Sequence, residues 1–256
     1  GLKLRYLLPV IGLLLLQSCQ HNDETTEEHP ARSVKPAEAA AYNAQLGLAY
    51  LKQGNRELAK HKLLLALSQA PDAPGVNASM AYFMEKSGDM DKATIFYQKA
   101  MALAPGAGAQ FNNYGAFLCR RGHYKEAEKY FMKAVKDVAY DHTAGAYENA
   151  GLCLMALSDD ATASAYFIKA LEQDPSRQQS LYELVTLNMK EGKMKEAYHH
   201  LKKHSNLCQN DRALLQLAIK VANQSGHFAQ EEDYKKRLKA LSENTGEHNE
   251  YNTSNG

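Results

Sequence analysis

Histidine and cysteine side chains gather in one short stretch of this chain, where they could coordinate a metal ion. His200, His204 and Cys208 are spaced four residues apart, so a helix would place all three on one face. Ligands spread over two helical turns lie too far apart to bind one ion without distorting the helix. The spacing therefore favours a surface histidine pair beside a half-buried cysteine, and the sequence predicts no metal site.

No arrangement of residues in the chain is typical of an active site. The sequence has no nucleophile elbow, no phosphate-binding loop and no paired carboxylates in a recognisable setting. Its formal net charge of +1 argues against nucleic-acid binding, which usually requires a basic patch. We therefore expect a protein that is not an enzyme and that uses no cofactor, nucleic acid or small-molecule substrate.

The N-terminal segment has the features of an export signal. Lys3 and Arg5 precede an apolar run over residues 7–16. A helix that spans a bilayer needs about 20 apolar residues, so this run is too short to be one. The pattern is instead typical of a cleaved signal peptide.

The apolar run ends in Leu-Gln-Ser-Cys at residues 16–19, which resembles the lipobox of bacterial lipoproteins. In that family the cysteine thiol is acylated, and cleavage leaves this cysteine as the new N-terminus. The resemblance implies a lipoprotein signal peptide at residues 1–18 and lipidation of Cys19. Gln20, which stands where an aspartate would resemble an inner-membrane retention signal, implies the periplasmic face of the outer membrane. The alternative is an ordinary secreted protein that is cut nearby.

Two polar segments flank the central part of the chain. Residues 19–39 contain acidic side chains and two prolines without apolar spacing, so we expect a flexible tether. Residues 242–256 are also polar, and we expect a disordered tail.

A spacing of 34 residues recurs between these two segments. It separates Pro71 from Pro105 and Gly192 from Gly226, and the frame slips by two residues near Asp141. The same spacing relates the members of three further sets: Gly54, Gly88 and Gly122; Ala59, Ala93 and Ala127; Ala66, Ala100 and Ala134. A fixed period of this length indicates stacked structural repeats.

The period and its residue types resemble the tetratricopeptide (TPR) family, in which each unit is a pair of antiparallel helices. The resemblance implies an all-α fold, a right-handed superhelical solenoid of six helix-pair units over residues 40–241. The aligned units are 40–73, 74–107, 108–141, 144–177, 178–211 and 212–241.

Particular positions in each unit have physical roles. Small residues allow two helices to approach closely, prolines end a helix, and glycines fit a left-handed turn between the two helices. The small residues are Gly47, Ala81, Gly115 and Gly151; the prolines are Pro71, Pro105 and Pro175; the glycines are Gly54, Gly88, Gly122 and Gly192.

The first helices of TPR units line a concave groove, which typically accepts a peptide or a helix. On that geometry the expected groove residues are Leu48, Leu51, Tyr82, Glu85, Asn112, Ala116, Glu148 and Leu152. The set is fairly apolar, so we expect hydrophobic protein binding. The alternative is that some of these residues only pack between helices.

The segments at 112–119 and 147–153, and the run at 214–219, resemble the PilW/PilF family. Members are outer-membrane lipoproteins with six TPR units that act as pilotins in type IV pilus biogenesis. The resemblance implies that the partner is the secretin subunit of the type IV pilus, engaged by the first units, and that the protein promotes secretin localisation and multimerisation. The alternative is a general envelope TPR lipoprotein, a scaffold for cell-wall enzymes or chaperones.

Two cysteines lie on the first helices of consecutive units. Cys119 and Cys153 occupy adjacent but not equivalent positions, and the periplasm is oxidising. We expect a disulfide that joins the third and fourth units across the slip. The alternative is two small buried side chains.

Overall fold

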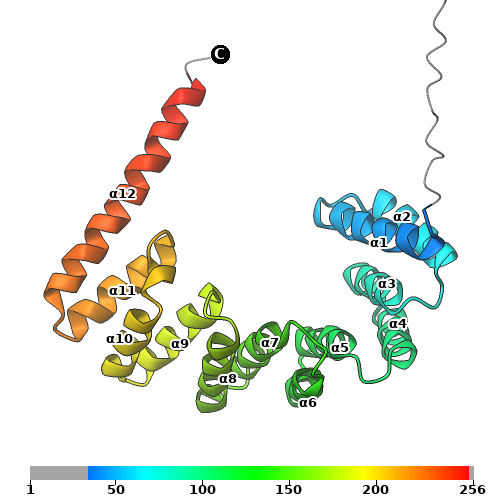
Figure 1. Cartoon of the computed structure of the whole chain (residues 1–256), viewed down its shortest axis with the longest axis horizontal. Helices are drawn as coiled ribbons and strands as arrows, with labels where there is room; N and C mark the ends of the chain where they lie inside the picture. The colour runs from blue at the N-terminus through cyan, green and yellow to red at the C-terminus, as the bar shows by residue number, and fades with distance from the viewer. Residues whose placement is uncertain (1–33, 254–256) are drawn as a thin grey trace, which may run out of the picture. The chain divides into compact units, whose positions relative to one another are not determined.

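The computed structural model describes residues 34–253, with side chains described as far as residue 244. Helices are the only regular secondary structure in that range, and twelve α-helices follow one another as six pairs (Figure 1). The expected all-α TPR solenoid is therefore confirmed. The predicted signal peptide at residues 1–18, Cys19 and the tether as far as residue 33 lie outside the described residues.

Each unit contributes a first and a second helix. The first helices are α1 (Pro36–Lys52), α3 (Pro74–Lys86), α5 (Gly108–Arg120), α7 (Thr143–Met155), α9 (Gln178–Lys190) and α11 (Arg212–Gln224). The second helices are α2 (Arg56–Gln69), α4 (Met90–Leu103), α6 (Tyr124–Lys136), α8 (Asp160–Gln173), α10 (Met194–Lys203) and α12 (Phe228–Thr253). A short 3-10 helix, η1 (Ser205–Cys208), follows α10.

Local sequence sets where these helices begin and end. Four helices have a side-chain cap at the N-terminus, in which the side chain accepts a hydrogen bond from the backbone N–H three residues later. The capping residues are Asn55 for α2, Asp89 for α4, Asp159 for α8 and Asp211 for α11. Pro36 and Pro74 occupy the first turns of α1 and α3, where a missing N–H costs nothing. Pro71, Pro105 and Pro175 all fall just after a second helix has ended, as predicted.

The glycines predicted between the two helices of a unit have the expected left-handed backbone. Gly54, Gly88, Gly122 and Gly192 have φ of 81°, 86°, 83° and 74°. In the fourth unit the same place is taken by Ser158, with φ of 56°. It is the one non-glycine residue with positive φ in the described part of the chain, and nothing in the repeat frame predicted it.

Close approach of the two helices in a unit depends on the predicted small residues. A Cβ added to Gly47 would lie 2.7 Å from Leu63 Cγ, and one added to Gly115 would lie 2.9 Å from Phe131 Cε1. At Gly151 the nearest atom would be Phe167 Cε1, at 2.7 Å. These distances are shorter than real Cβ contacts, so each position requires glycine at this helix separation.

The two-residue slip in the repeat lies in the loop between α6 and α7. There Asp137 Oδ2 accepts a hydrogen bond of 2.7 Å from the backbone N–H of Gly108, at the start of α5. Tyr140 packs so closely on Gly108 that an added Cβ would lie 2.6 Å from Tyr140 Cγ. The extra residues therefore fold back over the first helix of their own unit, which leaves the stacking of the helix pairs intact.

The core runs along the stack as three overlapping clusters of buried side chains. One cluster spans the first two units and shares Met84 and Phe96 with the next. The second and third clusters share Tyr166. Each unit thus buries its apolar face against its neighbours, as expected of a repeat protein.

Both ends of the predicted repeat region need correction. Helix α1 begins at Pro36, so the predicted tether, 19–39, extends four residues too far; Ala40 is fully buried, and alanine favours the helix. Helix α12 runs to Thr253, so the predicted disordered tail, 242–256, is wrong over residues 242–253. The buried Tyr234 anchors this helix, and adding residues to an existing helix is easy compared with starting one.

Candidate binding groove

Two adjoining depressions lie on the first helices of the first three units. The larger, of about 530 Å³, is bounded by residues of α1, α3 and the start of α2. The smaller, of about 270 Å³, lies between α1, α3 and α5. Leu48 and Tyr82 line both, so the two depressions meet at these side chains. We call the pair the N-terminal groove.

Apolar side chains and cations together line the larger depression. Leu48, Leu51 and Tyr82 supply its apolar surface, and all three were predicted groove residues. Lys52, Arg56 and Lys86 also line it. Arg56 Nη2 donates a hydrogen bond of 2.8 Å to the carbonyl oxygen of Lys86, which fixes the guanidinium beside the end of α3. These cations come from three different helices, so no local run of charge in the sequence marks them.

The smaller depression contains one more predicted residue, Ala116 of α5. Beside it are Asn113 and Arg120 of the same helix, neither of which was predicted. The Arg120 guanidinium carbon lies 5.6 Å from the Tyr82 ring centroid, and Lys86 Nζ lies 5.2 Å from it. Cations at this distance are attracted to the electron-rich face of an aromatic ring. The Tyr82 ring, which lines both depressions, therefore lies close to two positive charges.

Glu85, a predicted groove residue, is buried instead, and its carboxylate forms hydrogen bonds with side chains of other helices. Its side chain is 6% exposed, and its two carboxylate oxygens accept hydrogen bonds from Arg120 Nε at 2.6 Å and Nη2 at 2.8 Å. Tyr97 Oη donates a third, at 3.1 Å. Burial and the nearby Glu85 carboxylate raise the pKa of Tyr97. Burial alone would lower the pKa of Arg120, but the hydrogen bonds and charge of Glu85, with contributions from Tyr97 and Tyr82, together raise it.

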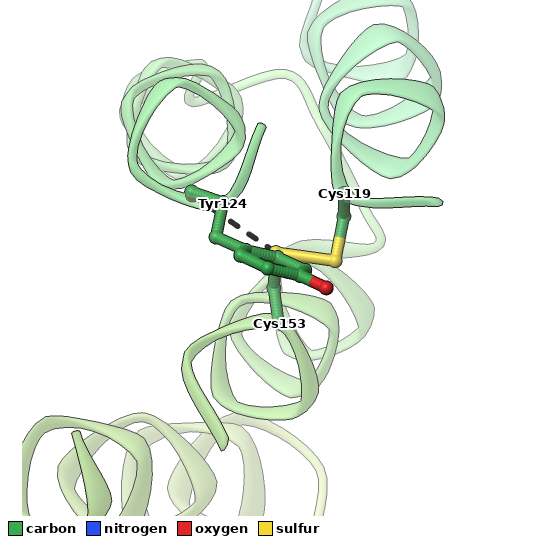
Figure 2. Close-up of a disulfide and its surroundings, with 3 residues drawn as sticks. All are labelled: Cys119, Tyr124 and Cys153. Atoms are coloured by element: carbon green, nitrogen blue, oxygen red, sulfur yellow. Dashed lines mark hydrogen bonds between the residues drawn. A yellow bond between two sulfur atoms is a disulfide. The ribbon is translucent and has the colours of Figure 1, made fainter. Parts of the chain in front are cut away.

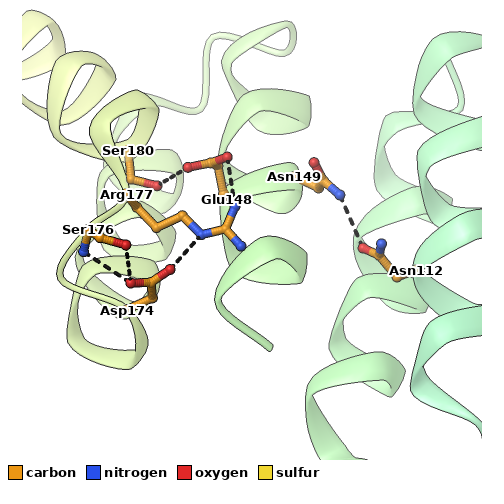
Figure 3. A network of polar contacts seen from close by, with 7 residues as sticks. All are labelled: Asn112, Glu148, Asn149, Asp174, Ser176, Arg177 and Ser180. Atoms are coloured by element: carbon orange, nitrogen blue, oxygen red, sulfur yellow. Dashed lines mark hydrogen bonds and ion pairs between the residues drawn. The ribbon is translucent and has the colours of Figure 1, made fainter. Parts of the chain in front are cut away.

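Three further predicted groove residues lie on α5 and α7, away from both depressions. Glu148 is used within the stack, because its carboxylate accepts a hydrogen bond of 2.7 Å from Ser180 Oγ and one of 3.4 Å from Arg177 Nη1 (Figure 3). Asn112 Oδ1 accepts from Asn149 Nδ2 at 3.1 Å, which links α5 to α7. Leu152 is 37% exposed. The structure therefore gathers four of the eight predicted residues around the groove.

The predicted cysteine pair is brought together. Cys119 near the end of α5 and Cys153 near the end of α7 are joined as a disulfide, with Cα atoms 5.8 Å apart (Figure 2). This separation is ordinary for a bridge. Cys153 Sγ also lies 3.9 Å from the carbonyl oxygen of Tyr124, which begins α6. The bridge thus sits where three helices of the third and fourth units meet.

The histidine–cysteine stretch does not form one helical face. Helix α10 ends at Lys203, and Cys208 lies fully buried in the 3-10 helix beyond it. Burial raises the pKa of the Cys208 thiol to about 11 and lowers the pKa of His200 and His204. Among residues 34–244, no group of His, Cys, Asp and Glu side chains could hold a metal ion. The predicted half-buried cysteine is thus a fully buried one, and the predicted surface histidine pair is also wrong, because His204 is buried and His200 is partly buried.

Comparison with known proteins identifies the family. The tetratricopeptide repeat model matches residues 144–177, the boundaries predicted for the fourth unit. The chain is 32% identical to the type IV pilus assembly protein PilF of Pseudomonas aeruginosa over 200 residues, which cover 77% of this chain and 78% of PilF. This chain belongs to the PilF/PilW family.

Solved structures agree with this family assignment. The structure of Pseudomonas aeruginosa PilF matches with a TM-score of 0.65 and 28% identity, over 86% of this chain and 99% of that one. The structure of PilW, described as a widely conserved type IV pilus biogenesis factor, matches with a TM-score of 0.62 and 26% identity, over 78% and 92%. An uncharacterised Haemophilus influenzae protein is 32% identical over 123 residues, which cover 48% of this chain and 69% of that protein.

The family's fold is a protein-interaction scaffold, and this member presents its N-terminal groove on that scaffold. Within the described range, no helix has both the length and the apolar composition needed to cross a membrane.

Proposed function

We propose that this PilF/PilW family protein is an outer-membrane lipoprotein pilotin for type IV pilus biogenesis. It binds the secretin subunit of the pilus and promotes secretin localisation and multimerisation in the outer membrane. The observation that carries the proposal is the 32% identity to a type IV pilus assembly protein over 77% of the chain. The protein acts by binding and is not an enzyme.

The anchor in this proposal is Cys19. The Leu-Gln-Ser-Cys sequence at residues 16–19 supports lipidation there, and Gln20 supports delivery to the outer membrane rather than retention at the inner one. Stable attachment needs more than one acyl chain, because each buried CH₂ contributes only about 0.8 kcal/mol. A lipoprotein cysteine that carries several chains meets this requirement and holds the repeat units at the periplasmic face.

The binding surface in this proposal is the N-terminal groove. Leu48 and Leu51 are partly exposed and line its larger depression, so they can contact an apolar partner segment. The groove belongs to the first three units, which are the units nearest to the proposed anchor in the sequence. The Cys119–Cys153 bridge would form in the oxidising periplasm and hold the third unit against the fourth.

Deletion of the gene tests the proposal. Membranes of the deletion strain are blotted for heat-stable secretin multimers, and piliation is scored in parallel. We expect multimers to be lost, restored by the wild-type gene, and restored poorly by a Leu48→Ala/Leu51→Ala variant. A Leu64→Ala/Ile95→Ala variant is the matched control, since these exposed residues lie on α2 and α4, outside the groove. Unchanged multimers with intact piliation would refute the pilotin function and favour the general envelope scaffold.

A further inference from the structure

The N-terminal groove has a charge pattern that its apolar residues alone do not explain. Its larger depression is lined by three cations and by no aspartate or glutamate. The smaller depression contains a fourth cation, Arg120, and also lacks a carboxylate in its lining. Glu85, whose carboxylate bonds to Arg120, is itself buried. The surface that faces a partner is therefore positive.

The cations of the larger depression have no acidic partner among the described side chains. None of the ion pairs formed by the described side chains includes Lys52, Arg56 or Lys86. Other lysines of the described range do form ion pairs, for example Lys190 with Asp160 at 2.8 Å. Lys52 and Lys86 end α1 and α3, and Arg56 begins α2, so the three charges are fixed to helix ends around one apolar surface.

We propose that the larger depression binds a partner segment in which an apolar side chain is flanked by acidic side chains. The apolar side chain packs against Leu48, Leu51 and Tyr82. The acidic side chains pair with Lys52, Arg56 and Lys86. The inference rests on the proposed function in one respect, that the secretin subunit supplies this segment.

Charge complementarity decides which occupant the depression fits. The electrostatic attraction between a carboxylate and a lysine is stronger beside an apolar contact that excludes water than it is in bulk solvent. A C-terminal carboxylate provides one anionic group, whereas the depression offers cations from the ends of α1 and α3 and the start of α2. Several acidic side chains around an internal apolar anchor therefore match the lining better than a single chain terminus does.

A peptide selection tests the inference without assuming which protein is the partner. A random peptide library displayed on phage is selected at low salt on the full mature protein, on a Lys52→Glu/Lys86→Glu variant and on a Lys129→Glu/Lys195→Glu control. The control changes the charge by the same amount at exposed lysines on α6 and α10. The acidic content of selected peptides and the affinity of the best synthetic peptide are then measured.

We expect wild type and control to select peptides rich in Asp and Glu next to apolar residues. The groove variant should lose this preference, bind the best peptide roughly tenfold more weakly, and select basic peptides instead. Replacing Glu by Gln in the peptide should weaken binding to wild type, as should added salt. Selected peptides without acidic enrichment, equal loss in the control variant, or no selection above the empty support would each overturn the inference. So would groove-dependent binding to phosphatidylglycerol vesicles with no peptide selected, which would assign the site to a lipid surface.

The outcome separates this inference from the proposed function. Suppose that the deletion strain loses secretin multimers and that the Lys52→Glu/Lys86→Glu variant restores them fully. This result refutes the inference and leaves the pilotin function standing. Intact multimers in that strain, with acidic peptides selected on the groove, refute the pilotin function and leave the inference standing.

Discussion

Arg120 of α5 binds Glu85 of α3 through both carboxylate oxygens, at 2.6 and 2.8 Å, although 35 residues separate the two in the sequence. The pair ties the second unit to the third directly beneath the N-terminal groove. Glu85 is almost fully buried, whereas the Arg120 side chain is 40% exposed. The two partners are therefore unequal, because the carboxylate has lost much more of its water than the guanidinium.

Removal of Arg120 should destabilise the protein more than removal of both partners together. In Arg120→Met the Glu85 carboxylate stays buried with only the Tyr97 hydroxyl as a partner, and we expect a loss of about 1–3 kcal/mol in the free energy of unfolding. In Glu85→Leu/Arg120→Met no charge is stranded, so most of this loss should be recovered. Urea denaturation followed by circular dichroism measures both. A double variant as unstable as Arg120→Met would contradict this account.

The same pair illustrates what the sequence could and could not predict. The spacing of glycine, alanine and proline predicted all six helix pairs, because those residues act within their own unit. The direction of Glu85 and Glu148 depends instead on cations and hydroxyls of the following unit, Arg120 for one and Arg177 with Ser180 for the other. The repeat pattern therefore places a carboxylate on the groove face even when its hydrogen-bond partner on another helix holds it inside the stack.

The cations of the groove are also hard to predict from the sequence, because they come together only in the folded stack. Lys52 and Lys86 end equivalent helices and could have been aligned through the repeat, since they are 34 residues apart. Arg56 joins them only because the turn through Gly54 brings the start of α2 to the same depression. A search for like charges that recur at the repeat period would have found two of the three.

Gly151→Ala should overpack the fourth unit. The new Cβ would lie 2.7 Å from Cε1 of Phe167, a ring that is fully buried and has little room to move. We expect a net loss of about 1–3 kcal/mol, because overpacking exceeds the gain of up to about 1 kcal/mol in helix propensity. Gly75→Ala in α3 is the control, since its Cβ would meet nothing within 4 Å. Equal thermal midpoints for the two variants would rule out the steric explanation.

Ser158→Gly should stabilise the protein. Ser158 has φ of 56°, a backbone conformation that costs about 1–2 kcal/mol for a residue with a Cβ, whereas the equivalent positions in other units are glycine. Glycine loses more freedom on folding, so we expect a net gain of about 0.5–1 kcal/mol. Ser158→Ala keeps the Cβ and should show no gain. Thermal unfolding of the three proteins under identical conditions decides the matter.

Acid should weaken the fifth unit through the buried His204 and the partly buried His200. Burial lowers the pKa of His200 and His204 in the folded protein, whereas an unfolded histidine binds a proton at about pH 6.5. The unfolded chain therefore binds more protons as the pH falls through and below about 6.5, and stability falls with it. His200→Gln/His204→Gln should flatten this part of the stability profile between about pH 7 and pH 5. The exposed His61→Gln should leave the profile as steep as in wild type.

The Cys119–Cys153 pair should be oxidised in protein taken from the periplasm. Peptide mapping by mass spectrometry without reductant should find the two cysteines in one linked species, and Cys208 should react with an alkylating agent only after denaturation because it is fully buried. A bridge that closes a loop of this length contributes about 3–4 kcal/mol by the chain-entropy argument. Reductant should lower the stability of wild type by about this amount. It should leave Cys119→Ala/Cys153→Ala unchanged, since that variant has no bridge to lose. Recovery of both cysteines as free thiols from the periplasm would show instead that they are two small side chains packed between α5 and α7.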